Sequence, residues 1–157
     1  MSLTAVWGRI GEATRDRVVA LVLGLPAWTV LGIASWLDAD PSGHGTHRQL
    51  GLGTCTILSM TGWSCPMCGM TTTFTHMAHF SVLDAVTTQP FGVVLFLLTL
   101  AVALMSVVEL VRPAGRLTRA WAWTMQREAV IAGALLGGLA LGWVYKLWEM
   151  QAGPFGP

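Results

Sequence analysis

All the cysteines and all the histidines of the 157-residue chain lie in one segment, residues 44–79. The cysteines are Cys55, Cys65 and Cys68, and the last two form the motif Cys-Pro-Met-Cys. A Cys-x-x-Cys pair can cycle between dithiol and disulfide, bind a metal ion, or act as a structural staple. The motif alone is compatible with each of these three roles.

The redox role has a simple structural basis in the residues that follow Cys65. Proline suits the first position of a helix, so we predict a helix from Pro66 to about Phe80, followed by a second short helical piece at 81–89. Cys65 would then be the cap and Cys68 would lie in the first turn. The positive end of the helix dipole lowers the pKa of a thiol placed there, which would make Cys65 and Cys68 the reactive pair.

The metal-binding role requires ligands beyond the Cys-x-x-Cys pair. Cys55 together with His44 or His47 would complete a set suited to zinc, and nearby methionines would favour copper(I). The expected cofactor is therefore zinc, copper or none.

A helix from Pro66 would place one stripe of polar residues along an arc of about 80°. The stripe comprises Cys65, Cys68, Thr72, His76 and His79. Cys68 and His76 would be about 12 Å apart along the axis, which is too far for one ion. His76 and His79 are therefore a possible separate site.

The block around the motif resembles a bacterial family known as domain of unknown function 2752. The resemblance is carried by Cys55, by Thr61-Gly62-Trp63-Ser64, and by Cys65-Pro66-Met67-Cys68-Gly69-Met70-Thr71. It implies a short three-span membrane protein in which Gly69 and Thr71 belong to the same unit as the cysteines. The family usually has arginine at the next position, where this chain has Thr72. The resemblance implies no particular reaction.

Composition indicates that these residues are positioned by membrane helices. Only 11% of the residues are charged, 54% are hydrophobic, and the mean hydropathy is +0.61. We predict an all-α integral membrane protein, a single membrane domain over 1–157, with spans at about 18–36, 91–111 and 129–148. The segment 37–90 would form an interfacial or re-entrant helical segment at the outer face.

Orientation follows from the basic residues, because seven of the nine lie before the first span or between the second and third. The positive-inside rule then places the N-terminus in the cytoplasm, and residues 37–90 and the C-terminus outside a bacterial inner membrane. Lys146 and Glu149 are interpreted as an interfacial pair, with the lysine reaching toward the headgroups.

The expected partner is the lipid bilayer, and a net charge of +1 gives no reason to expect nucleic acid. Glycines with small-xxx-small spacing in the third span would allow another helix, or a second copy, to approach: Gly133, Gly137, Gly138 and Gly142. No nucleotide loop or acid–base pair is present, so whether the protein is an enzyme stays open. A non-catalytic accessory subunit or assembly factor is the alternative to a thiol or metal site.

Overall fold

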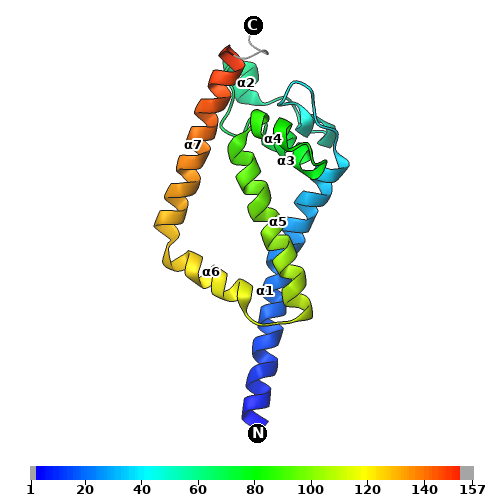
Figure 1. Cartoon of the computed structure of the whole chain (residues 1–157), viewed down its shortest axis with the longest axis vertical. Coiled ribbons are helices and arrows are strands. Elements are labelled where there is room, and N and C mark those ends of the chain that lie inside the picture. Colours follow the sequence, from blue (N-terminus) through cyan, green and yellow to red (C-terminus); the bar gives the residue numbers. More distant parts are fainter. Residues whose placement is uncertain (1–2, 153–157) are drawn as a thin grey trace. The chain divides into compact units, whose positions relative to one another are not determined.

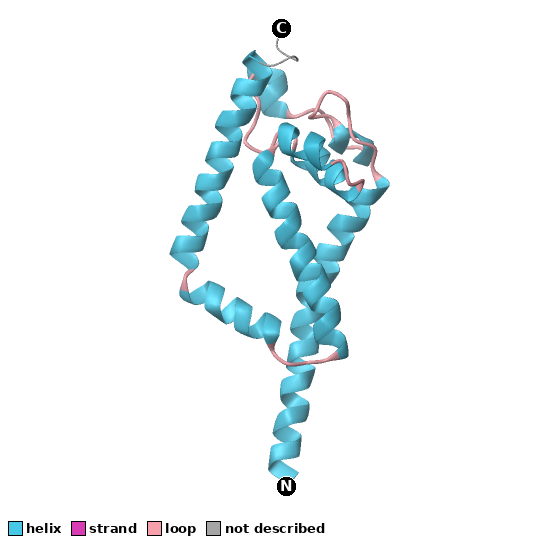
Figure 2. Cartoon of the chain, in the orientation of Figure 1, coloured by secondary structure: helices cyan, strands magenta, loops and turns pink. Residues whose placement is uncertain are grey.

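The computed structural model describes residues 3–152, which fold into helices joined by loops, with no strand among them (Figures 1 and 2). In chain order the elements are α1 (Leu3–Trp36), the 3-10 helix η1 (Thr46–Leu50), α2 (Thr56–Thr61), α3 (Met70–Ala78), α4 (Val82–Thr88), α5 (Pro90–Val111), α6 (Arg116–Gln126) and α7 (Glu128–Ala152). The predicted all-α class is confirmed.

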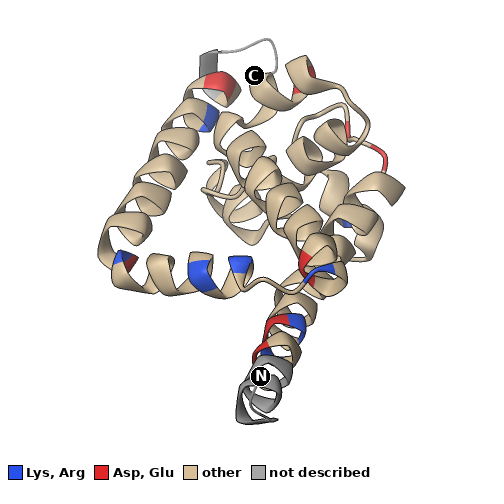
Figure 3. Cartoon of the chain, turned by 60° about the horizontal axis from the view of Figure 1, so that its bottom comes forward, with Lys and Arg blue, Asp and Glu red and all other residues tan. Residues whose placement is uncertain are grey.

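Three of these helices are long and apolar enough to cross a membrane: Gly11–Trp36 of α1, Pro90–Val111 of α5 and Glu128–Met150 of α7. The most apolar stretches of these helices have only 11–22% of their residues buried inside the protein. Apolar side chains left outside to that extent require lipid around them. Figure 3 shows how little charge α5 carries, since Glu109 is its only charged residue. The three spans predicted from sequence lie within these helices.

The chain divides into two compact units. The first consists of residues up to Val30 and of Leu98–Ile131, and within it α1 packs against α5. The indole N–H of Trp28 donates a 3.1 Å hydrogen bond to the carbonyl oxygen of Ala103. Gly24 lies so close to Ser106 that an added methyl group would clash with the serine side chain. A glycine is therefore needed where these two helices approach.

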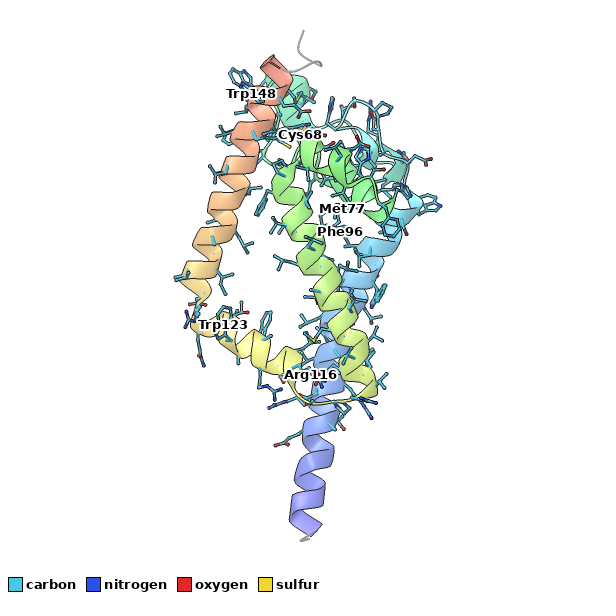
Figure 4. The ribbon with its side chains drawn as sticks, viewed as in Figure 1. Cys68, Met77, Phe96, Arg116, Trp123 and Trp148 are labelled. Atoms are coloured by element: carbon cyan, nitrogen blue, oxygen red, sulfur yellow. The ribbon has the colours of Figure 1, made fainter. Side chains whose placement is uncertain are left out.

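A buried carboxylate organises the loop between α5 and α6. The Glu109 side chain is fully buried, and its Oε1 accepts hydrogen bonds from the backbone N–H groups of Ala114, at 2.6 Å, and of Gly115. Its Oε2 lies 3.7 Å from a guanidinium nitrogen of Arg116, a residue labelled in Figure 4. The carboxylate thus satisfies backbone donors at the start of α6, a helix that hydropathy did not predict.

The second unit consists of Leu31–Leu97 and of the residues from Ala132 onward, and it contains the cysteines. The α3–α4 hairpin packs on the first turns of α5, where the rings of Phe74 and Phe96 meet edge to face at 5.4 Å. Gly138 and Gly142 of α7 lie directly against Phe91. By contrast, methyl groups added at Gly133 or Gly137 would meet nothing within 4 Å.

Candidate functional site

The Cys-Pro-Met-Cys motif lies in a turn that precedes α3, not in the helix itself. The backbone N–H of Cys68 donates to the carbonyl oxygen of Cys65 at 2.9 Å, which closes the turn. Gly69 then takes a left-handed conformation, with φ +84°, and is the N-cap of α3, which begins at Met70. The prediction of a helix beginning at Pro66 was therefore wrong, because Gly69 separates the motif from the helix.

The third cysteine comes from a different element but reaches the same place. Cys55 is the N-cap of α2, and its carbonyl oxygen accepts a hydrogen bond from the N–H of Ser59. Its thiol interacts directly with the thiol of Cys65, which in turn interacts with the thiol of Cys68. All three are free thiols. Cys65 is thus the middle member of a chain of three sulfur atoms.

The three thiols have different acidities because their surroundings differ. Hydrogen bonding from the backbone N–H of Leu58 lowers the pKa of Cys55. Burial raises the pKa of Cys65, and the neighbouring Cys55 thiol raises it further. Burial also raises the pKa of Cys68 to about 11, and that side chain is only 5% exposed. The expected lowering of pKa by a helix terminus at Cys65 and Cys68 is therefore wrong, and Cys55 is the most acidic of the three.

A cavity of about 510 Å³ opens onto these sulfur atoms. It is lined by all three cysteines and by His44 and His47. The motif residues Gly69, Thr71 and Thr72 also line it. The structure thus brings together all eight residues of the principal site predicted from the sequence.

The loop that carries His44 and His47 is fastened to α3 by buried hydroxyl groups. The side-chain oxygens of Thr46 and Thr72 are 2.9 Å apart, and both residues are completely or almost completely buried. The Thr46 hydroxyl also accepts the N–H of Asp40 at 2.9 Å. Thr72, at the position where the resembled family usually has arginine, therefore anchors the histidine loop to α3.

The histidines differ in how they relate to the cysteines. His44 Nδ1 lies 2.7 Å from the carbonyl oxygen of Ser42, which fixes its ring at the cavity. His79 Nε2 lies 3.1 Å from the carbonyl oxygen of Ser35 at the end of α1, and His76 is in the last turn of α3. Neither His76 nor His79 lines the cysteine cavity. Over the described part of the chain, no three Cys, His, Asp or Glu side chains form a group that could hold a metal ion.

Sequence reasoning missed one residue beside the site, Lys146 of α7. Its side chain is 1% exposed, so the interpretation of a lysine reaching toward the headgroups was wrong. Its Nζ lies 2.6 Å from Oε2 of Glu149 and donates to the carbonyl oxygen of Thr88 at 3.3 Å. Its charge also acts on the thiol of Cys68, the residue labelled in Figure 4. A lysine inside an apolar span, with an acid three residues later, was the available signal.

Comparison with known proteins agrees with the resemblance seen in the cysteine block. Residues 55–103 match the model of a family described as "Protein of unknown function (DUF2752)". The matched stretch begins at Cys55, includes the motif and the α3–α4 hairpin, and ends within α5. No curated protein and no solved structure matches the chain.

Proposed function

We propose that this membrane protein carries out thiol–disulfide exchange through Cys55, Cys65 and Cys68. The observation that supports the proposal is the central position of Cys65, whose thiol interacts with the other two at one cavity. Exchange requires a thiolate in contact with a disulfide sulfur, and three sulfurs in sequence provide both partners within one chain.

The acidities of the thiols assign the direction of attack. Cys55 has the lowered pKa and is the nucleophile, and it attacks the Cys65 sulfur of a Cys65–Cys68 disulfide. The Cys55–Cys65 bond forms, the Cys65–Cys68 bond breaks, and the electron pair of the broken bond passes to the Cys68 sulfur. The number of disulfides is unchanged. A partner dithiol that enters the cavity would reduce the disulfide, giving up two electrons and two protons and becoming a disulfide itself.

We propose the outer face of a bacterial inner membrane as the location, with the N-terminus in the cytoplasm and the C-terminus outside. The support is the distribution of basic residues. Seven of the nine precede the first span or lie between the second and third spans, and the positive-inside rule assigns those segments to the cytoplasm. An oxidising compartment is also where exchangeable disulfides persist. Fusing alkaline phosphatase to the C-terminus should give an active reporter, whereas an inactive reporter would contradict this orientation.

The test of the exchange proposal is thiol trapping in intact cells. Cells are treated briefly with oxidant or with reductant, alkylated, and analysed at peptide level by mass spectrometry. We expect both the Cys65–Cys68 and the Cys55–Cys65 disulfides, in proportions that follow the treatment, and only the former in Cys55→Ser. Ser59→Ala, one turn into α2, is the matched control. Three cysteines that stay reduced, or stay oxidised, under both treatments would refute cycling.

Elemental analysis of the purified full-length protein tests the metal-binding alternative. About one equivalent of zinc or copper per chain in the wild type, lost in Cys55→Ser, would replace the exchange proposal with a metal site. A cofactor-free protein is what the exchange proposal expects.

The burial of Cys68 favours a second candidate, an accessory subunit or assembly factor whose cysteines are a structural staple. Such a protein needs a partner, either a second copy or another membrane protein. Gly133 and Gly137 are positions where α7 has room for one, since nothing would meet an added methyl group there. A Cys65→Ser, Cys68→Ser double variant that loses stability but still binds its partner would favour this candidate.

A further inference from the structure

A buried cation lies next to the cysteine site and is not used by the exchange step described above. Lys146 is almost completely inaccessible within α7, a helix apolar enough to span a membrane. An ionisable residue in such a segment is energetically costly, and it is usually retained for a function. The surroundings of its ammonium group therefore indicate what it does.

The Lys146 side chain has close neighbours both in its own helix and in the loops of the cysteine region. Glu149 and the carbonyl oxygen of Thr88 bind its Nζ, at 2.6 Å and 3.3 Å. Two glycines near the cysteine turn also lie close to this side chain. A methyl group at Gly43 would be 3.4 Å from Nζ, and one at Gly69 would be 3.5 Å from Cε. The ammonium group is thus fixed against the turn that carries Cys68.

We infer that Lys146 is a positioning residue of the exchange site, whose ammonium group stabilises the negative charge that develops on the Cys68 sulfur as the Cys65–Cys68 disulfide opens. The biological role of this electrostatic interaction rests on the proposed exchange function. Lys146 keeps its protons in this step, and the electron pair stays on the sulfur. Glu149 and Thr88 act by holding the ammonium group in place.

The need for such a charge follows from the burial of Cys68. A thiol with a pKa of about 11 gives a poor leaving group, because disulfide opening slows as the pKa of the departing thiol rises. A thiolate that forms in a buried position also loses its hydration. The positive charge of Lys146 opposes both effects, and it already lowers the pKa of Cys68 against the larger influence of burial. Among lysines and arginines, Lys146 has the largest effect on the pKa of this thiol.

The experiment measures alkylation of Cys68 by iodoacetamide, an uncharged reagent, in the purified full-length protein in its reduced state. Rates are read at peptide level over a range of alkaline pH. At pH values below the pKa of Cys68, Lys146→Met should lower the alkylation rate of Cys68 about five- to tenfold. The reason is that a rise of one unit in the pKa of a thiol lowers its thiolate fraction tenfold at such pH values. Lys146→Arg should restore most of the rate. Tyr145→Phe, which removes a neighbouring hydrogen bond to the carbonyl of Thr87, is the control and should leave the rate unchanged.

A merely structural lysine would give a different result. If Lys146 only holds the turn through its hydrogen bonds, Lys146→Met would loosen the turn and Cys68 would react faster. If Lys146 only fills space, the rate would not change. Either result would overturn the inference. Glu149→Gln provides a second variant if Lys146→Met fails to fold. It leaves the ammonium charge less neutralised and should speed the reaction of Cys68 but not that of Cys65, whereas a loosened turn would speed both and would overturn the inference. Alkylation of the purified protein does not depend on disulfide cycling in cells. The role of Lys146 and the exchange function can therefore be refuted independently.

Discussion

The indole N–H of Trp143 in α7 donates a 2.8 Å hydrogen bond to the carbonyl oxygen of Ser64, the residue immediately before Cys65. This bond ties the cysteine turn to α7. Trp143→Phe keeps the aromatic ring but removes the donor, and should cost about 1 kcal/mol of unfolding free energy. Alkylation of Cys65 should accelerate as the turn loosens. Peptide-level mass spectrometry measures this, and Trp148→Phe, at a side chain 65% exposed, should change neither property.

The three thiols should react in a fixed order as the pH rises. The thiolate is the nucleophile, so a lowered pKa gives reaction at lower pH and a raised pKa delays it. Cys55 should therefore be alkylated first, Cys65 later, and Cys68 only as the pH approaches about 11. Rates measured for each peptide across pH provide the check. If Cys68 is modified first in folded protein, the assignment of Cys55 as nucleophile is wrong.

Gly69 should not tolerate a side chain. Its φ of +84° is unfavourable for other residues, and a methyl group there would lie 2.9 Å from the carbonyl oxygen of Gly43. We expect Gly69→Ala to lower stability by at least about 1–2 kcal/mol, the cost of a left-handed conformation. The matched control is Gly53→Ala, where nothing lies within 4 Å. Thermal unfolding in detergent compares them, and equal midpoints would contradict the described turn.

Glu109 should be needed to hold the start of α6. Glu109→Gln keeps the size of the side chain but replaces charged hydrogen bonds with neutral ones, for a loss of about 1–3 kcal/mol. The exposed Glu128, in the first turn of α7, offers the control Glu128→Gln. Hydrogen exchange should become faster at the amides of Ala114 and Gly115 in the first variant only. Unchanged protection would show that the carboxylate is dispensable.

The glycines of α7 should separate into two classes. Gly138 faces the ring of Phe91 without room for a methyl group, so Gly138→Ala should cost about 1–3 kcal/mol through overpacking. At Gly137 nothing lies within 4 Å, and alanine there should be neutral or slightly stabilising because it favours the helix. The unfolding of both variants is compared in the same detergent. If Gly137→Ala instead changes the oligomeric state, a partner helix packs at that position.

The spans were predictable because hydropathy is a local property of the sequence. An apolar run such as 91–111, interrupted only by Glu109 near its end, has few alternatives to a membrane helix, and the structure gives Pro90–Val111. The grouping of the cysteines was also predictable, since Cys55 and the motif are linked by only a short segment. The α6 helix was missed because eleven residues with two arginines do not resemble a span.

The details of the site depend on interactions that sequence periodicity does not contain. Because Gly69 has a left-handed backbone conformation, α3 begins at Met70 and not at the predicted Pro66. The Cys-Pro-Met-Cys motif therefore lies before the helix and not in its first turn. The burial of Lys146 depends on the approach of α7 to residues that are far away in sequence, such as Thr88. Such long-range contacts reverse the expected acidity of Cys68 and change the interpretation of Lys146.

The position of both charges of the Lys146–Glu149 pair on one helix has a consequence for biogenesis. Because the residues are three apart, the ion pair can form within α7 as that helix enters the bilayer, and the segment inserts with its charges already neutralised. The cysteine turn and Thr88 precede α7 in the order of synthesis. A nascent chain that stops before α7 would thus present Cys68 without the charge of Lys146, which arrives with the last span.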